Sequence, residues 1–238
     1  MIPGTLYVVA TPIGNLEDIT LRALRVLKEV GLVACEDTRR TRTLLSHFGI
    51  HVPVTSYFEH NKLAKGPAIL KTLRGGTSVA LVTDAGTPGI SDPGFLLVKE
   101  AREAGIPVVP VPGPSAVVAA LSAAGVPADH FVFDGFLPVK PGRRIHRLEA
   151  LRGLETTLVC YESPHRILAT LGAIGQVFGQ VEIVVARELT KQFEEIVRGT
   201  PAALLERFAA GTVRGEFTLV IPHAKTPRSV ERPGSAAR

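Results

Sequence analysis

Strand-like and helix-like segments alternate along the first half of the chain, and this alternation limits the folds it can adopt. Residues 5–10, 32–35, 79–83 and 108–111 read as short apolar strands, and residues 21–30, 40–48 and 95–104 read as helices between them. Thr20 is a plausible N-cap of the first helix, and Gly31 follows its end. Such alternation is typical of a mostly parallel sheet with helices on its faces, so we expect an α/β fold.

The pattern changes after residue 112. Strand-like runs follow at 131–136, 157–161, 182–186, 195–198 and 216–221, with fewer helices between them. We therefore expect two α/β domains, 1–112 with a mostly parallel sheet and 113–223 with a mixed sheet. Residues 224–238, rich in Pro, Ser, Gly and Arg, are expected to be a disordered basic tail.

The longest segment after an expected strand is loop 84–94, and it is the strongest candidate for ligand binding. Its eleven residues include three glycines and two prolines. Glycine lets the backbone approach a ligand closely, and proline stiffens its path. Connections in α/β units usually have about two to six residues, so a plain crossover is the weaker interpretation. In open α/β sheets ligands bind beyond the carboxyl ends of the strands, where this loop should lie.

Several function classes lack their usual sequence signals. The first strand is not followed by G-x-G-x-x-G, and the chain has no Walker A motif, no G-x-S-x-G and no metal-ligand spacing of His, Asp or Glu. Cys35 and Cys160 lie in apolar runs and are expected to be reduced core residues. The uncharged stretch 106–128 contains five prolines, so we expect no membrane span, and we see no signal peptide.

The net charge of +5 is concentrated in two segments. Residues 140–152 hold five basic residues and one acidic residue, and residues 224–238 hold four and one. The first segment is the better candidate for contacting phosphate, through Lys140, Arg143, Arg144 and Arg147. A solvated loop and helix face is an equally good interpretation of it.

Six motifs in order resemble those of the tetrapyrrole-methylase superfamily of S-adenosylmethionine methyltransferases. They are VATPIGNLEDIT, CEDTRRT, VTDAGTPGISDPG, VPGPSA, YESPHR and ARELTK, within a resemblance that runs from residue 4 to residue 221. The resemblance implies two α/β domains with the cofactor in the cleft between them, and a cytoplasmic homodimer. Thr87 stands where tetrapyrrole enzymes of the family have an aspartate, a form associated with the RNA-modifying branch.

The resemblance also implies which positions contact S-adenosyl-L-methionine. These are mostly small or apolar, as expected of a ligand held by backbone groups and an apolar adenine slot. They are Pro12, Ala85, Gly86, Thr87, Ile90, Ser115, Ala116, Glu162 and Leu189. The helix expected to open at Ser115 and Ala116 would offer free N–H groups to a carboxylate.

The RNA-modifying branch implies 2′-O-methylation of a cytidine ribose in the decoding region of small-subunit (16S) ribosomal RNA. The partner is then that RNA or the small ribosomal subunit, and no metal is required. Two alternatives remain open: C-methylation of a tetrapyrrole, and a non-catalytic RNA-binding module. Methylation of a protein side chain is more distant.

The sequence does not select one catalytic residue. Carboxylates that follow strands could accept the proton of a ribose hydroxyl, and basic side chains could bind phosphate or polarise the acceptor. The carboxylates are Glu36, Asp37, Glu162 and Glu188, and the basic side chains are Arg39, Arg166, Arg187 and Lys191. Glu36 and Asp37 could instead cap the next helix, and His165 is more often structural in such a turn than a base.

Overall fold

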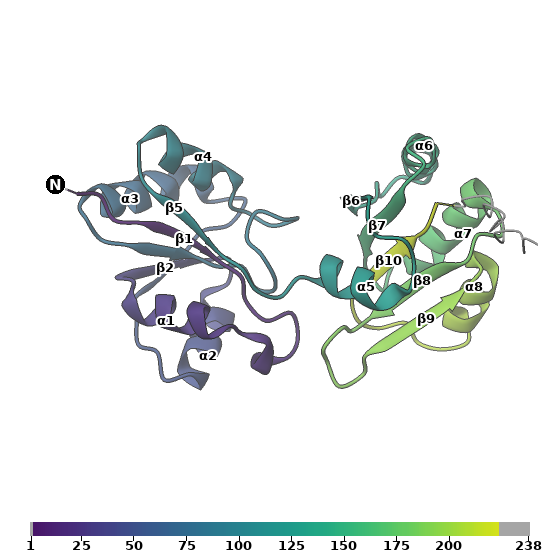
Figure 1. Ribbon diagram of the computed structural model, residues 1–238, viewed down its shortest axis with the longest axis horizontal. Coiled ribbons are helices and arrows are strands. Elements are labelled where there is room, and N and C mark those ends of the chain that lie inside the picture. The colour runs from purple at the N-terminus through teal and green to yellow at the C-terminus, as the bar shows by residue number, and fades with distance from the viewer. Residues whose placement is uncertain (1, 224–238) are drawn as a thin grey trace, which may run out of the picture. The chain divides into compact units, whose positions relative to one another are not determined.

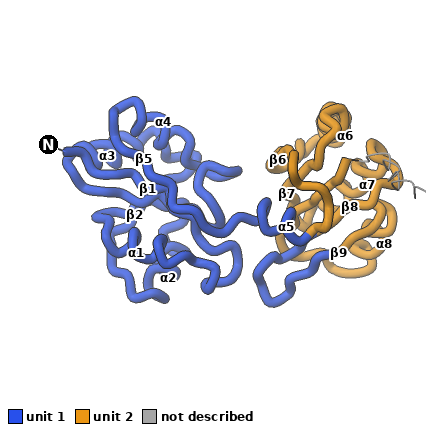
Figure 2. The backbone as a smooth tube through the Cα atoms, viewed as in Figure 1, with its two compact units in different colours: residues 1–123, 186–196 blue, residues 124–185, 197–238 orange. Residues whose placement is uncertain are grey.

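The computed structural model describes residues 2–223, which form two compact units (Figure 2). The first unit holds the described residues up to Ala123 together with Ala186–Ile196. The second holds Ala124–Val185 and the described residues from Val197 onward. The first unit thus extends beyond the boundary expected at residue 112, and it includes a short segment from much later in the chain. The tail expected at 224–238 lies outside the described residues.

The first unit is built on a five-stranded parallel sheet, as the alternating pattern predicts. The strand order is β3-β2-β4-β1-β5, and every adjacent pair is parallel. The strands are β1 (Leu6–Val9), β2 (Leu32–Cys35), β3 (Val54–Ser56), β4 (Val79–Leu81) and β5 (Val108–Val111). The helices are η1 (Leu16–Asp18), α1 (Leu21–Glu29), α2 (Thr38–His47), α3 (Lys62–Arg74) and α4 (Phe95–Glu103), followed by α5 (Ala116–Ala124).

Helices cover both faces of this sheet (Figure 1). Side chains of α1 and α2 pack on one face in a cluster with Val9, Val33 and Ala80. Side chains of α3 and α4 pack on the other with Leu6 and Leu81. Strands buried on both faces explain the short, nearly uninterrupted apolar runs in the sequence.

Local signals set several helix boundaries. The hydroxyl of Thr20 accepts a hydrogen bond from the backbone N–H of Ala23 and caps α1, as predicted. Asp37 caps α2 in the same way by accepting from the N–H of Arg39. Helix α3 was not predicted, because Gly66 and Pro67 lie inside it and both disfavour a helix interior.

The second unit contains a mixed five-stranded sheet, as predicted. Its strand order is β6-β7-β10-β8-β9, with β6 and β7 parallel and β7 and β10 antiparallel. The strands are β6 (Phe131–Phe136), β7 (Thr157–Glu162), β8 (Ile183–Arg187), β9 (Glu195–Gly199) and β10 (Phe217–Ile221).

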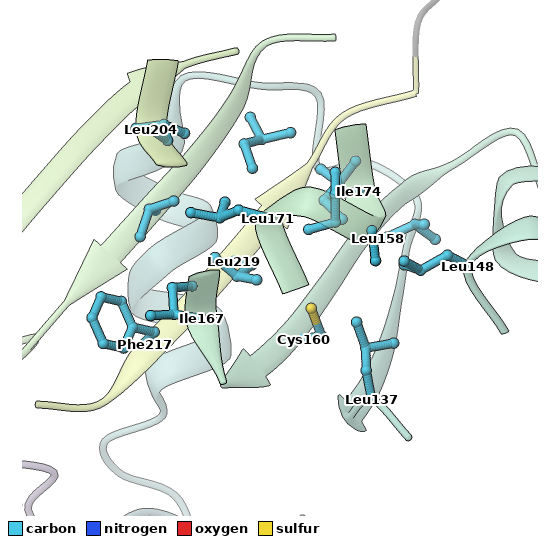
Figure 3. Close-up of a cluster of buried hydrophobic side chains, with 14 of the residues drawn as sticks. Leu137, Leu148, Leu158, Cys160, Ile167, Leu171, Ile174, Leu204, Phe217 and Leu219 are labelled. Atoms are coloured by element: carbon cyan, nitrogen blue, oxygen red, sulfur yellow. The ribbon is translucent and has the colours of Figure 1, made fainter. Parts of the chain in front are cut away.

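Fewer helices separate the strands of the second sheet than those of the first, as expected, but the sequence did not locate them. Helices α6 (Pro141–Arg152), α7 (Ile167–Phe178) and α8 (Pro201–Ala209) separate its strands. Their side chains close the core against one face of the sheet, with Leu148, Ile174 and Leu204 packed on Leu158 and Leu219 (Figure 3). Helix α7 is apolar on most of its circumference, so its 3.6-residue period is weak in the sequence.

None of the helices in residues 2–223 is long and apolar enough to cross a bilayer.

Candidate functional site

The loops that follow β1, β2, β4 and β5 lie at one edge of the first sheet, because parallel strands end on the same side. Loop 84–94, which follows β4, is bonded to the loop after β1. The N–H of Thr11 donates to Gly86 O at 2.9 Å, and the N–H of Gly86 donates to Thr11 O at 3.0 Å. The buried Thr11 hydroxyl also donates to Thr83 O at 3.0 Å. The expected binding loop is therefore held by backbone hydrogen bonds at its first turn.

Gly86 is the point where three of these loops approach each other. Its φ of +85° lies in the left-handed region that glycine tolerates. A Cβ added there would lie 3.6 Å from Cγ2 of Ile13, after β1, and 4.0 Å from the carbonyl oxygen of Pro114, after β5. The structure thus gathers most of the expected cofactor positions at one edge of the first unit: Pro12, Ala85, Gly86, Thr87, Ile90, Ser115 and Ala116.

The exposure of these positions suits a ligand held by backbone groups. Pro12 and Gly86 are buried, whereas Ala85 is exposed and the Ile90 side chain is 49% exposed. Ile90 therefore offers apolar surface to solvent beside a rigid glycine turn. This fits an apolar ring lying on the loop with polar groups near the backbone.

Two carboxylates at the same edge share one threonine. The hydroxyl of Thr83 donates to Oε2 of Glu36 at 3.2 Å. The Asp92 carboxyl also hydrogen-bonds Thr83, and burial together with the charges of Glu36 and Asp84 raises the pKa of Asp92 to about 6. Because one hydroxyl carries one proton, Thr83 cannot donate to both carboxylates at once. When it donates to Glu36, its hydrogen bond with Asp92 requires a proton on Asp92. Asp92, beside Glu36, can thus take up a proton near pH 6.

The other carboxylates after β2 and β4 are bound to arginines. Asp37 accepts from Nη2 of Arg39 at 2.8 Å, and hydrogen bonds from Arg39 lower the pKa of Asp37 to about 2. Asp84 accepts from the N–H of Asp37 and lies 3.3 Å from Nη1 of Arg40. As a helix cap with a lowered pKa, Asp37 is a poor proton acceptor.

The segment Ala186–Ile196, which runs from the last two residues of β8 to the first two of β9, packs on the loop after β1. A side chain at Gly14 would collide with Lys191 and Thr190, so only glycine allows this approach. Glu188 and Thr190 both have positive φ, at 50° and 67°. The Glu188 carboxylate lies 2.8 Å from Nζ of Lys191, and Leu189 is buried. The four residues singled out in ARELTK, Arg187, Glu188, Leu189 and Lys191, thus belong to the first unit, which their distance in sequence does not reveal.

In the second unit, the Glu162 side chain is fully enclosed and its oxygens are already hydrogen-bonded. Oε1 accepts from the N–H of Ser163 at 2.8 Å and lies 3.3 Å from Nε of Arg166, and Oε2 accepts from the Thr170 hydroxyl at 2.6 Å. With 0% side-chain exposure, a cofactor could reach this residue only through its backbone. Glu162 and Arg166 therefore stabilise the turn after β7, while His165 is exposed.

The basic segment forms helix α6, and its four candidate residues have different environments. Arg144 is buried, and its guanidinium donates to the carbonyls of Pro138 and Val139. Arg147 is paired with Asp134 of β6, with Nε at 3.0 Å from the carboxylate. Lys140 and Arg143 are exposed and form no ion pair with the described residues. The geometry thus leaves Lys140 and Arg143 as the available cations and gives Arg144 a structural role.

Asp92 and Thr83 were not singled out from the sequence. In the sequence Asp92 is only one residue of loop 84–94. Its raised pKa arises from burial and from the carboxylates of Glu36 and Asp84, and neither can be read from neighbouring residues. Cys35 and Cys160 are free and buried, as predicted. Within the part of the chain that is described, no three His, Cys, Asp or Glu side chains are placed to hold a metal ion.

Comparison with known proteins places the chain in a family. The family model described as Tetrapyrrole (Corrin/Porphyrin) Methylases matches residues 5–205. The chain is 51% identical to the Ribosomal RNA small subunit methyltransferase I of Mesorhizobium japonicum, covering 95% of this chain and 79% of that protein. It is also 51% identical to the protein of the same name from Pseudomonas aeruginosa, covering 100% and 85%.

Among solved structures, a cobalt precorrin-4 methyltransferase of cobalamin biosynthesis matches with a TM-score of 0.69. It is 20% identical and covers 92% of this chain and 94% of that one, a likeness that concerns the fold. The extent of the family match and the identity with full-length relatives lead to one conclusion: the chain belongs to the tetrapyrrole (corrin/porphyrin) methylase family.

Proposed function

We propose that this chain transfers a methyl group from S-adenosyl-L-methionine to the 2′-hydroxyl of a cytidine ribose in the decoding region of small-subunit (16S) ribosomal RNA. The proposal rests on sequence identity: over 95% of its length, the chain is 51% identical to a relative named ribosomal RNA small subunit methyltransferase I. We further propose that it acts in the cytoplasm as a homodimer, without a metal ion.

The residues at the edge of the first sheet fit the cofactor. Backbone groups around Gly86, the exposed Ala85 and Ile90, and the start of α5 at Ala116 would hold its adenosine and carboxylate. Leu189 belongs to the same unit and would contribute apolar surface. When bound, the cofactor supplies a methyl group that is already activated by its positive sulfur.

The protein's own task is then to position the ribose hydroxyl and to accept its proton. Well-oriented reactants can supply about 7–11 kcal/mol of the barrier, and a positioned base about 10²–10⁴-fold in rate. Among the candidate carboxylates, Asp37 is bound to Arg39 and Glu188 to Lys191. Glu36 and Asp92, which share Thr83, are better suited to receive the proton, and Arg39 and Arg40 could bind the adjacent phosphate.

A labelling experiment tests the proposal. The protein is incubated with methyl-labelled cofactor and, in separate reactions, small ribosomal subunits lacking the modification, free 16S RNA and uroporphyrinogen. We expect label in one cytidine of the RNA, with mass spectrometry of nuclease fragments locating it on the ribose. Label in the porphyrin and none in RNA would establish tetrapyrrole C-methylation instead. RNA binding without label in any acceptor would indicate a non-catalytic module.

A further inference from the structure

The edge strand of the second sheet carries a row of aromatic side chains that the proposed chemistry does not use. Phe131, Phe133 and Phe136 lie on β6, and Tyr161 lies opposite Phe136 on β7. The rings of Phe133 and Tyr161 are 4.9 Å apart, and those of Phe136 and Tyr161 are 5.7 Å apart, all edge to face. We call these four residues the aromatic edge.

A β-bulge places these rings on one face. Residues three apart in a regular strand point to opposite faces. Phe133 pairs with Val159 and Phe136 with Tyr161, so three residues of β6 span two of β7. Gly135 lies in this interval with a φ of +64°, a conformation typical of a bulge. The extra residue turns Phe136 to the same side as Phe133.

This face is the one opposite the helices of the second unit. Val132, Leu158 and Cys160 pack into the core beneath α6 and α7. Phe133 and Tyr161 alternate with these residues, so they point away from that core. Phe136 is 54% exposed and Phe131 is 43% exposed, so apolar ring surface reaches solvent.

The loop that follows Phe136 is rigidly held. The guanidinium of Arg166 donates to the carbonyl of Leu137, and that of Arg144 donates to the carbonyls of Pro138 and Val139. Three successive carbonyls are therefore bound by buried or half-buried arginines. This loop connects Phe136 directly to Lys140, the N-cap of α6. The exposed ring and the exposed cation thus have a fixed backbone between them.

Helix α6 brings two arginines to the same edge strand, of which Arg147 is paired with a carboxylate and Arg143 is not. Arg147 reaches Asp134 on β6, and Arg143 lies one helical turn before Arg147 on the same face of α6. Because α6 starts just after β6 ends, Arg143 in its first turn lies toward the Phe136 end of the strand. Neither Lys140 nor Arg143 has a carboxylate partner within residues 2–223.

We propose that the aromatic edge is a stacking platform for unpaired nucleobases of the RNA substrate, with Lys140 and Arg143 binding the adjacent phosphates. Aromatic rings beside cations are the recurring means by which proteins hold single-stranded nucleic acid, since every base has a face to stack. A second copy of the chain is a poorer occupant, because a two-fold contact would bring these unpaired cations toward their own copies. This inference rests on the proposed RNA substrate.

The test compares Phe136→Leu with Phe136→Trp in the full-length protein, with Leu154→Ala as control. Leu154 is equally exposed at 54%, lies just beyond α6 and belongs to no proposed site. Affinity is measured for a short unpaired RNA that carries 2-aminopurine, whose fluorescence falls on stacking, and for the same RNA in a duplex. Phe136→Leu should weaken binding of the unpaired RNA by roughly ten-fold and abolish the quenching. Phe136→Trp and Leu154→Ala should bind as the wild type does.

Several outcomes would overturn the platform. One is unchanged affinity and quenching in Phe136→Leu, and another is an equal loss for unpaired and duplex RNA. A shift from dimer to monomer in sedimentation, with RNA affinity unchanged, would assign the surface to a contact between copies. Wild-type protein that methylates RNA while Phe136→Leu binds it normally would refute the platform alone. Wild-type protein that neither binds nor methylates RNA would refute the proposed function as well.

Discussion

At the scale of single residues, adjacent arginines on α6 perform different tasks. Arg143 is exposed, whereas the Arg144 side chain is buried and satisfies two backbone carbonyls. The sequence presents them as one basic pair, and only burial distinguishes them. Their mutational effects should therefore differ in kind.

We predict that Arg144→Ala lowers the free energy of unfolding by about 1–3 kcal/mol, because it leaves buried carbonyls without donors. Arg143→Ala should change it by less than about 0.5 kcal/mol, as expected of an exposed side chain. Urea denaturation of both variants measures this difference. Equal stability of the two variants would contradict the structural role of Arg144.

Asp92 provides a second prediction, which concerns stability against pH. A carboxyl whose pKa is raised to about 6 in the folded protein penalises folding once it ionises. The penalty is absent well below the unfolded pKa of about 3.9, grows as pH rises to about 6, and is constant above that. Asp92→Asn should therefore be more stable than the wild type at pH 7.5, by on the order of 1 kcal/mol after allowing for solvent screening of a half-buried group.

Denaturation curves at pH 7.5 and pH 4 check this prediction. The stability gained by Asp92→Asn should shrink as the pH falls. Thr83→Val, which removes the shared hydroxyl but keeps its volume, serves as the comparison, and it should destabilise at both pH values. A gain that is the same at both pH values would show that Asp92 does not titrate in this range.

The same group should shape the pH dependence of catalysis. If Glu36 and Asp92 receive the proton, methyl transfer at saturating substrate should increase with pH through about 6 and then level off. Asp92→Asn should lose activity while it gains stability, an outcome that a purely structural role would not produce. Single-turnover rates across pH 5–8 measure this, and an unaltered profile in the variant would remove Asp92 from the mechanism.

At the scale of elements, loop 84–94 combines backbone strain with close approach. Gly86 and Gly89 have the same φ of +85°. A Cβ added at Gly86 would meet Ile13 and Pro114 within 4 Å, whereas one added at Gly89 would meet open space. The two glycines are therefore a matched pair. A substitution at Gly89 tests backbone conformation alone. A substitution at Gly86 tests conformation together with the position where three loops meet.

We predict that Gly86→Ala and Gly89→Ala each lower stability by about 1–2 kcal/mol, the cost of a left-handed conformation for a residue with a Cβ. Affinity for S-adenosyl-L-methionine should fall clearly more in Gly86→Ala. Calorimetric titration of the cofactor into both variants gives the comparison. Equal losses of affinity would mean that the loop matters through its conformation and that the backbone at Gly86 does not contact the cofactor.

At the scale of the whole molecule, RNA binding can follow either the net charge of +5 or the particular cations at the start of α6. The double variant Lys140→Ala/Arg143→Ala should weaken binding to unpaired RNA. It should also reduce the slope of log affinity against log salt by about 1.4, which corresponds to two phosphate contacts. Affinity for the cofactor should stay unchanged.

The control for this variant is Lys71→Ala/Arg74→Ala at the end of α3, which removes the same charge from exposed positions in the first unit. Filter binding over a range of salt concentrations compares the two. If both double variants reduce the slope equally, the RNA responds to net charge and α6 has no special part.

Much of the fold could be predicted from local pattern. The strands of the first sheet are buried on both faces and appear as short apolar runs, and caps such as Thr20 mark helix starts. The six motifs identified the family, because glycine and proline at set intervals record the backbone path of the loops between strands. These features depend on neighbours in sequence, so the sequence alone determined them.

Other features depend on which distant residues come together, and only the tertiary structure decided them. The segment Ala186–Ile196 joins the first unit because it packs on Gly14. Arg144 on α6 is buried whereas its neighbour Arg143 is exposed. The pKa of Asp92 is raised by burial and by the carboxylates of Glu36 and Asp84. The bulge at Gly135 turns Phe136 to the face of Phe133. Burial, charge proximity and strand register are set by contacts far apart in the chain, and no local pattern records them.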